Sequence, residues 1–276
     1  MKDDACVRFL QWALPRLGMR WPGYRKVRGG VCKRVARRIR ELRLRDINAY
    51  RLRLEASEEE WKTLDGLLRV SISRFYRGRA LFDRLKDRLL PGIAEKTIAA
   101  GGDRIHIWCA GCASGEEPYT LALIWRLALR GRFPDLDFRV TATDADAHLL
   151  SRAGAASYSP SSLKELPGGW RDQAFDPEGK TFRLKDPYRE GVEFHLQDIR
   201  RETPSGPFDL ILCRNLAFTY FGEELQREVL KRILGPLRPG GFLVIGAHEE
   251  LPGDGEGMEE LGEGVWGRII PAGTKG

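Results

Sequence analysis

Four carboxylates that follow predicted β-strands are the residues of this chain best suited to chemistry. Glu116 and Glu117 stand in AGCASGEEP (110–118), Asp144 ends TATD, and Asp198 lies in LQDI. The carboxyl ends of parallel strands meet at one edge of a sheet, so we expect these side chains to line one crevice. Carboxylates there favour a cationic ligand, because they would repel the phosphate that such loops often hold.

The loop 110–118 joins a predicted strand to a predicted helix and is built of small residues. Ala110 and Gly111 allow a tight turn and a close approach of the backbone to a ligand. Pro118 suits the first helical position, where its missing N–H costs nothing, and this placement leaves both glutamates in the loop. Ser114 and Glu117 could instead form a capping box. The sequence leaves open which glutamate caps the helix and which binds a ligand.

S-adenosyl-L-methionine meets these requirements, because it carries an ammonium group, a sulfonium and an adenosine but no phosphate. Asp144 is placed to hold the ribose hydroxyls. Asp198 is placed to meet the adenine amino group, with Ile199 against the ring. A lone Asp at a strand end is more often a turn former, but the loop and the two acids arrive in the order that a nucleoside site requires. We therefore predict this cofactor, with S-adenosyl-L-homocysteine as its product.

Strands and helices alternate after Gly101 and Gly102, which predicts a parallel sheet with helices on both faces. This order is the one expected of a Rossmann-like, α/β methyltransferase domain, which we predict over 91–276. The interval 158–190 is too long for a simple connection and predicts a small inserted β subdomain. The expected strands are 104–110, 137–144, 191–199, 208–213 and 241–247, with 265–270 as an antiparallel edge, and the expected helices are 118–130, 147–157 and 223–237.

The first part of the chain has helical periodicity and a strongly basic composition. Residues 1–90 carry 24 Lys and Arg against 11 Asp and Glu, whereas the remainder is mildly acidic. We predict an all-α N-terminal domain over 1–70 and a linker helix over 71–90. The helix 31–44 places Val31, Val35, Ile39 and Leu42 on one apolar stripe.

The opposite face of this helix concentrates positive charge and has two interpretations. It is either a solvated surface or a docking surface for an acidic helical partner, since like charges this dense repel one another unless a complementary surface arrives. Arg34 and Arg38 are the substrate contacts predicted there. Nucleic acid is not expected, because the sequence lacks an interleaved aromatic and basic platform. The basic residues of this face are Lys33, Arg34, Arg37, Arg38 and Arg40.

The cysteines and the hydropathy pattern argue for a cytoplasmic protein. No apolar run approaches the roughly 20 residues that span a bilayer, and the first twenty residues lack a signal peptide. An odd, scattered set of cysteines predicts buried thiols and not a disulfide framework. Cys109 and Cys112 form a C-x-x-C that could be redox-active or half a zinc site, but packing under the turn is favoured, and no metal is expected. The five are Cys6, Cys32, Cys109, Cys112 and Cys213.

Several blocks of the chain resemble the CheR-type methyltransferases, which esterify glutamate side chains on methyl-accepting chemotaxis receptors. The resemblance runs from about residue 8 to residue 270, and its combination of motifs is specific. It implies a helical basic N-terminal domain, a Rossmann-like catalytic domain and an inserted β subdomain. The blocks are RVSISRFYRGRALFDRLKDRLLP (69–91), WCAGCASGEEPYTLAL (108–123), TATDAD (141–146), FDLILCRN (208–215) and GPLRPGGFLVIGAHE (235–249).

The resemblance also implies roles for individual residues. Arg77, in SRFYR, corresponds to the active-site arginine near the transferred methyl group. Tyr220 is the candidate for the family's tyrosine, although Thr219 stands at its usual spacing. The implied cofactor contacts are Ala110, Gly111, Glu117, Asp144, Asp198, Ile199 and Asn215. The remaining expected substrate contacts are Ser73 and Arg214, besides Arg34 and Arg38.

The chemistry is consistent with so small a set of residues. A glutamate carboxylate has a pKa of about 4.3 and is already ionised at pH 7, so it can attack a sulfonium methyl without a general base. Alignment of the reactants can contribute roughly 7–11 kcal/mol, and the guanidinium fork of Arg77 would orient the carboxylate. Departures at Ser71, Ser73 and GAHEE (246–250) touch the acceptor side. The alternatives are a related enzyme acting on another carboxylate, a non-catalytic cofactor-binding sensor, and an RNA methyltransferase.

Overall fold

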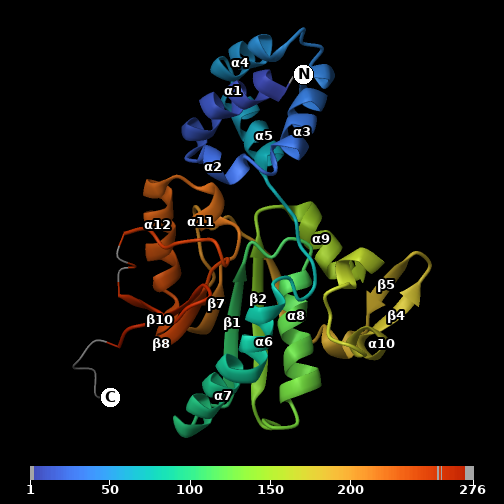
Figure 1. Cartoon of the computed structure of the whole chain (residues 1–276), viewed down its shortest axis with the longest axis vertical. Coiled ribbons are helices and arrows are strands. Elements are labelled where there is room, and N and C mark those ends of the chain that lie inside the picture. Colours follow the sequence, from blue (N-terminus) through green and yellow to red (C-terminus); the bar gives the residue numbers. More distant parts are fainter. Residues whose placement is uncertain (1–2, 254, 256, 271–276) are drawn as a thin grey trace. The chain divides into compact units, whose positions relative to one another are not determined.

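The computed structural model describes residues 3–253, 255 and 257–270, and the chain divides into two compact units (Figure 1). The first unit comprises Met1–Ser71 and Asn215–Arg227, and the second comprises Ile72–Arg214 and Glu228–Gly276. A segment that lies late in the sequence therefore belongs to the helical unit at the start of the chain.

The first unit is all-helical. Asp46 accepts hydrogen bonds from the first backbone N–H groups of α4, and Ser57 does the same for α5, so side chains start both helices. Phe9, Leu10 and Leu64 are among its buried residues. Its elements are α1 (Asp3–Ala13), η1 (Leu14–Leu17), α2 (Trp21–Tyr24), α3 (Arg28–Glu41), α4 (Ile47–Glu55), α5 (Glu58–Leu68), α11 (Ala217–Tyr220) and the beginning of α12 (Glu223–Leu234).

A disulfide bond between Cys6 and Cys32 corrects the expectation that all five cysteines are free thiols. Cys6 lies on α1 and Cys32 on α3, and packing of these two helices brings their Cα atoms to 6.0 Å. Neither an odd cysteine count nor sequence spacing carries that information. The remaining three, Cys109, Cys112 and Cys213, are buried and form no disulfide bond.

The central sheet of the second unit has the strand order β6–β2–β1–β7–β8–β10–β9. The first five of these strands are parallel to their neighbours, whereas β10 pairs antiparallel with β8 and β9. The predicted parallel sheet is thus confirmed. β10 is antiparallel, as predicted for 265–270, but it is not the edge strand, because β9 lies outside it. The strands are β1 (Arg104–Ala110), β2 (Asp137–Asp144), β6 (Val192–Leu196), β7 (Phe208–Leu212), β8 (Leu237–Val244), β9 (Met258–Glu260) and β10 (Val265–Arg268).

One face of β1 and β2 is apolar and covered. Ile105, Ile107 and Val140 form a buried cluster with Leu121 and Ile124 of α8. Figure 1 shows α8 running alongside β2. The helices of this unit include α6 (Arg79–Arg84), η2 (Leu85–Leu89), α7 (Leu90–Ala99), α8 (Glu116–Ile124), η3 (Trp125–Leu129), α9 (Ala147–Ala155) and the rest of α12. The predicted linker helix over 71–90 is helical only from Arg79 onward.

The opposite face of the same strands departs from the expectation of helices on both faces. Residues 197–207, which connect β6 to β7 across β2 and β1, form turns and contain no helix. The side chains on that face alternate with the apolar ones and are polar at His106 and Thr141, whereas Trp108, farther along β1 on the same face, is buried. A face of this composition matches a half-covered sheet better than a doubly covered one.

A second sheet of three short antiparallel strands lies between β2 and β6 in the chain. Its order is β3–β5–β4. Phe175 and Leu184 of this sheet are buried in a cluster with Tyr119 of α8 and with Phe75. Its elements are β3 (Ser157–Tyr158), η4 (Pro160–Leu163), α10 (Trp170–Ala174), β4 (Phe175–Glu178), β5 (Thr181–Leu184) and η5 (Asp186–Tyr188). Over the described part of the chain, no helix is long and apolar enough to span a bilayer.

Replacing Cys6 and Cys32 together by alanine should lower the free energy of unfolding of the helical unit by about 2–4 kcal/mol, because the unfolded chain loses a cross-link. Urea denaturation followed by circular dichroism measures the change. A reducing agent should destabilise the wild type by a similar amount and leave the double variant unchanged. Equal stability of wild type and variant under oxidising conditions would show that the two cysteines are not bonded in solution.

Candidate functional site

The central feature of the site is a buried ion pair between Arg214 and Glu117. Arg214 follows β7, Glu117 lies in the first turn of α8, and Nη1 of the arginine donates to Oε2 of the glutamate at 2.7 Å. The side chains are only 8% and 15% exposed, so water screens the pair weakly. Nη2 of Arg214 donates to the backbone carbonyl of Arg77 at 2.8 Å. Three residues predicted for the site are thus in direct contact.

The loop between β1 and α8 is held against the end of β2. The backbone N–H groups of Gly111 and Cys112 both donate to the carbonyl of Thr143, at 2.8 and 3.0 Å. Asp144 accepts from the backbone N–H of Ala113 through Oδ2 and from that of Asp146 through Oδ1, each at 2.9 Å. Asp144 therefore shapes the loop as well as standing at its rim.

The start of α8 differs from the sequence prediction. The helix begins at Glu116, so Glu116 and Glu117 are its first two residues, and Pro118 is the third and not the first. Gly115 is the residue before the helix and adopts φ +89°, where glycine is favoured. Because Gly115 occupies the cap position and no side chain caps the helix, the capping box between Ser114 and Glu117 does not form.

The two glutamates consequently have different environments. Glu117 faces Arg214, whereas Glu116 is 4% exposed and accepts 3.4 Å hydrogen bonds on Oε1 from the hydroxyls of Ser114 and Ser162. Its Oε2 is buried and has no hydrogen-bond partner among the described residues. Neither glutamate side chain caps the helix. Glu117 is the one that lies beside Arg214, and its role in binding a ligand stays a prediction.

Asp198 and Ile199 lie just beyond β6, and Asp198 already has a strong partner. The guanidinium of Arg200 donates to both carboxylate oxygens of Asp198, with Nη2–Oδ2 at 2.6 Å and Nε–Oδ1 at 3.0 Å. The backbone N–H of Arg200 also donates to Oδ1, which makes Asp198 a turn-forming residue. Ile199 is buried. The predicted adenine contact of Asp198 stays a prediction, and it would be made by a carboxylate already paired with arginine.

Arg77 stands at the end of an extended segment that precedes α6. Its Nη1 donates to the carbonyl of Ile72, which closes the segment into a loop around the half-buried Ser73. Gly78 follows at φ +85°, and a Cβ there would lie 3.1 Å from Nη2 of Arg214. A residue without a side chain is therefore required where the arginine crosses the loop.

Asn215 and Tyr220 belong to the first unit, so their predicted roles stay predictions. Asn215 directly follows Arg214 in the chain and adopts φ +55°. The ring of Tyr220 lies 5.1 Å from that of Tyr24, and the backbone of Thr219 accepts a hydrogen bond from Arg20. These contacts join α11 to α2 within the helical unit. Whether Thr219 or Tyr220 fills the tyrosine role stays open.

The two arginines predicted to contact substrate on α3 are engaged inside the first unit. Arg34 donates to the carbonyls of Leu67 and Arg69 at 2.7 and 2.8 Å, which satisfies groups at the end of α5. Arg38 forms a two-pronged pair with the buried Glu60 at 2.9 and 2.8 Å. The hydrogen bonds from Arg38 hold the pKa of Glu60 below the usual range. Arg34 and Arg38 of α3 thus stabilise their own unit.

The apolar stripe of α3 is buried as predicted at Val31, Val35 and Ile39.

The C-x-x-C pair behaves as packing residues. Cys109 and Cys112 are free and buried beneath the loop, and burial raises the pKa of both thiols well above the usual range. A high pKa disfavours the reactive thiolate. Within the described ranges, no group of three or more His, Cys, Asp or Glu side chains could hold a metal ion. The packing interpretation is confirmed.

A family model described as CheR methyltransferase, SAM binding domain, matches residues 71–265. The chain belongs to this family. It is 31% identical over 231 residues to a probable chemotaxis protein methyltransferase of Rhizobium etli, covering 81% of this chain and 85% of that one. It is 32% identical over 185 residues to a chemotaxis protein methyltransferase of Listeria monocytogenes, covering 67% of each. It is 34% identical over 182 residues to chemotaxis protein methyltransferase 1 of Pseudomonas aeruginosa, covering 64% and 65%.

Among solved structures, the chain is similar to the N-methyltransferase NodS of Bradyrhizobium japonicum in complex with S-adenosyl-L-homocysteine. The identity is 18% and the TM-score 0.33, over 59% of this chain and 61% of that one. The fold assignment rests on the strand order, a seven-stranded sheet with one antiparallel strand inserted near its end. The protein is accordingly a SAM-dependent methyltransferase with a Rossmann-like α/β domain.

The buried polar atoms around Arg214 fit the methionine end of this cofactor. Nε of Arg214 is a buried donor without a hydrogen-bond partner in the described part of the chain. Oε2 of Glu117 accepts a hydrogen bond from Arg214, and the same carboxylate can accept further hydrogen bonds. An amino-acid group carries both an ammonium, which suits Glu117, and a carboxylate, which suits Arg214. The CheR-family cofactor and this donor and acceptor set are therefore compatible.

Tyr158 is a residue of the site that sequence reasoning did not identify. It lies in β3, is buried, and donates its hydroxyl to the carbonyl of Ser114 in the loop at 2.8 Å. Its ring meets that of Phe75 edge-on at 4.7 Å, two residues before Arg77. Burial raises the pKa of Tyr158, so the hydroxyl keeps its proton and stays a donor. The only sequence signal was an aromatic residue at the start of the predicted insertion.

Replacing Tyr158 by phenylalanine should weaken S-adenosyl-L-methionine binding roughly 2- to 10-fold, because the Ser114 carbonyl loses one hydrogen bond worth about 0.5–1.5 kcal/mol. Calorimetric titration measures the affinity. Tyr119→Phe is the matched control: that hydroxyl is equally buried but donates to the Ala153 carbonyl on α9 at 3.1 Å. Equal losses of affinity in the two variants would mean that Tyr158 acts only through general packing.

Proposed function

We propose that the protein transfers the methyl group of S-adenosyl-L-methionine to glutamate side chains of an acidic helical protein, producing methyl esters. The observation that carries this proposal is the contact of Arg214 with both Glu117 and the backbone of Arg77. This contact supports the proposal because it joins the backbone of Arg77 to the residue that pairs with Glu117, the glutamate suited to the ammonium group of the cofactor. The names of the relatives, chemotaxis protein methyltransferases, support a receptor-type substrate.

The proposed mechanism requires no general base from the protein. The bound cofactor supplies an electrophilic methyl group, and an ionised glutamate needs no base to attack it. Glu117 and Arg214 hold the amino-acid end of the cofactor, and Asp144 stands where the ribose is expected. One N–H of Arg77 is used on Ile72, and a guanidinium has five. The remaining donors of Arg77 can orient the attacking carboxylate, which is an alignment effect and not proton transfer.

The substrate's acidic helix is proposed to dock on the exposed basic residues of α3. Arg34 and Arg38 are tied into the unit, which leaves Lys33, Arg37 and Arg40 as the exposed cations of the predicted basic face. Arg37 has only a surface ion pair with Glu41 at 3.5 Å, and such pairs contribute little. The cytoplasmic location and the absence of nucleic-acid binding stay predictions.

Arg77→Ala should reduce methyl transfer roughly 100-fold or more, because misplacing a reactant by about an ångström has this effect, while cofactor affinity stays near that of the wild type. The assay follows base-labile radiolabel from S-adenosyl-L-methionine into lysate protein. Arg79→Ala, at a neighbouring exposed arginine, is the control and should keep activity. Turnover by Arg77→Ala at the wild-type rate would remove the proposed role. Label appearing only in small molecules would redirect the substrate assignment.

Charge reversal of Arg37 and Arg40 to glutamate should weaken productive association with an acidic protein substrate by on the order of tenfold at low salt, and less as salt is raised. The measurement is kcat/KM at several ionic strengths. Binding of S-adenosyl-L-methionine should not change. The midpoint of thermal unfolding should fall only slightly, because the reversal removes an exposed ion pair between Arg37 and Glu41 and places acids near the end of α3. A salt-independent kcat/KM in wild type and variant alike would place the docking surface elsewhere.

A further inference from the structure

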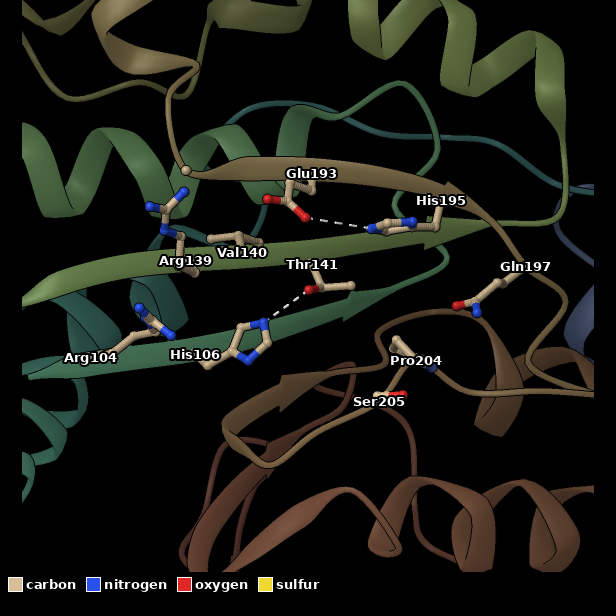
Figure 2. A pocket seen from close by; sticks show the side chains of 11 residues that line it. Arg104, His106, Arg139, Val140, Thr141, Glu193, His195, Gln197, Pro204 and Ser205 are labelled. Carbon is tan, nitrogen blue, oxygen red and sulfur yellow. Dashed lines mark hydrogen bonds and ion pairs between the residues drawn. The ribbon is translucent and has the colours of Figure 1, made fainter. Parts of the chain in front are cut away.

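A polar cleft of about 610 Å³ lies on the sheet face that no helix covers (Figure 2). Its floor is made by β1, β2 and β6, and Pro204 and Ser205 of the connection to β7 line its other side. All of these residues belong to the second unit. Its volume falls within the range of small-molecule sites, roughly 300–1,000 Å³. The proposed methyl transfer uses none of the side chains that line it.

Two guanidinium groups gather at one end of the cleft. Nε of Arg104 and Nε of Arg139 donate to the same oxygen of Asp137, at 3.0 and 2.8 Å. Figure 2 shows the two arginine side chains on neighbouring strands at the same end of the cleft. Because Asp137 takes only the Nε groups, it orients both forks and leaves their terminal nitrogens for another acceptor. Paired arginines held in this way suit the oxygens of a phosphate or a carboxylate.

The rest of the cleft offers acceptors and neutral groups. Oε1 of Gln197 is buried and has no hydrogen-bond partner within the described ranges. Glu193 lies 3.8 Å from His195 on the same strand. His106 shares a 2.9 Å hydrogen bond with Thr141, and burial lowers the pKa of His106, which keeps its ring neutral at pH 7. Hydroxyl or amino donors of a ligand would find acceptors at Gln197 and Glu193.

The positions of these groups indicate a ligand-binding site and not merely a solvated polar surface. His106, Thr141 and Glu193 stand within β1, β2 and β6, where a covered parallel sheet would be apolar. The ion pairs of the cleft residues are largely exposed and contribute little to stability. A buried amide oxygen without a hydrogen-bond partner destabilises the folded chain. A bound donor at Gln197 would remove that destabilisation.

We propose that this cleft binds a small polyhydroxylated phosphate ester. The phosphate oxygens would be held between Arg104 and Arg139, and the hydroxyl groups would donate to Gln197 and Glu193. A carboxylate in place of the phosphate would use the same arginine forks, and the experiment separates the two.

The test follows the imidazole NMR signals of the protein saturated with S-adenosyl-L-homocysteine, so that the cofactor's ribose site is filled. The chain has four histidines, of which His106 and His195 line the cleft, whereas His148 and His248 do not. Ribose 5-phosphate should shift the first two signals and not the others. Inorganic phosphate should bind more weakly, with a Kd of roughly millimolar order, and ribonate, which has a carboxylate and no phosphate, weaker than ribose 5-phosphate.

Variants assign the two ends of the cleft. The double variant Arg104→Gln/Arg139→Gln should weaken ribose 5-phosphate and inorganic phosphate at least tenfold. Gln197→Met should weaken ribose 5-phosphate alone. The matched control is Arg171→Gln/Arg183→Gln, which removes two exposed arginines that are also paired with carboxylates.

Two results would overturn the proposal. One is an unchanged pair of signals for His106 and His195 with all three probes. The other is an equal loss of binding in the control double variant, which would show that the anion responds to overall charge. Tighter binding of ribonate than of ribose 5-phosphate would replace the phosphate ester by a hydroxy acid.

Discussion

The buried ion pair between Arg214 and Glu117 is the contact on which the arrangement of the site depends. It joins the end of β7 to the first turn of α8, and the same guanidinium holds the carbonyl of Arg77. Because both charges are largely removed from water, breaking the pair would leave an uncompensated buried charge, which costs several kcal/mol. The positions of the end of β7, the start of α8 and the backbone at Arg77 are therefore coupled.

The inserted antiparallel sheet is linked to the same loop. The hydroxyl of Tyr158 donates to the carbonyl of Ser114, and the hydroxyl of Ser162 donates to Glu116. The backbone N–H of Phe75 in turn donates to the carbonyl of Ser162. These contacts connect the insertion both to the loop 110–118 and to the segment that carries Arg77. The insertion thus helps to hold these two segments in place besides adding surface.

Charge is used differently in the two units. On α3, Arg34 and Arg38 have hydrogen-bond partners inside their own unit and stabilise it. The other basic residues of the same face are exposed, a difference that the sequence does not reveal. On the uncovered face of the central sheet, Arg104 and Arg139 share Asp137 and keep their terminal nitrogens for other acceptors. In both places the distribution of hydrogen bonds, and not the number of charges, distinguishes fold-stabilising from binding groups.

The local pattern of the chain was sufficient to predict the alternating strands and helices and the loop 110–118, because these follow from hydrophobic periodicity and short-range turn chemistry. The family was indicated separately, by the resemblance of several motifs. Tertiary structure decided the rest. The start of α8 at Glu116, the disulfide between Cys6 and Cys32, the partners of Arg34 and Arg38, and the bare face beside the connection to β7 all depend on which elements become neighbours. Contacts between residues far apart in the chain leave no periodic signal in it, so only the folded arrangement determines them.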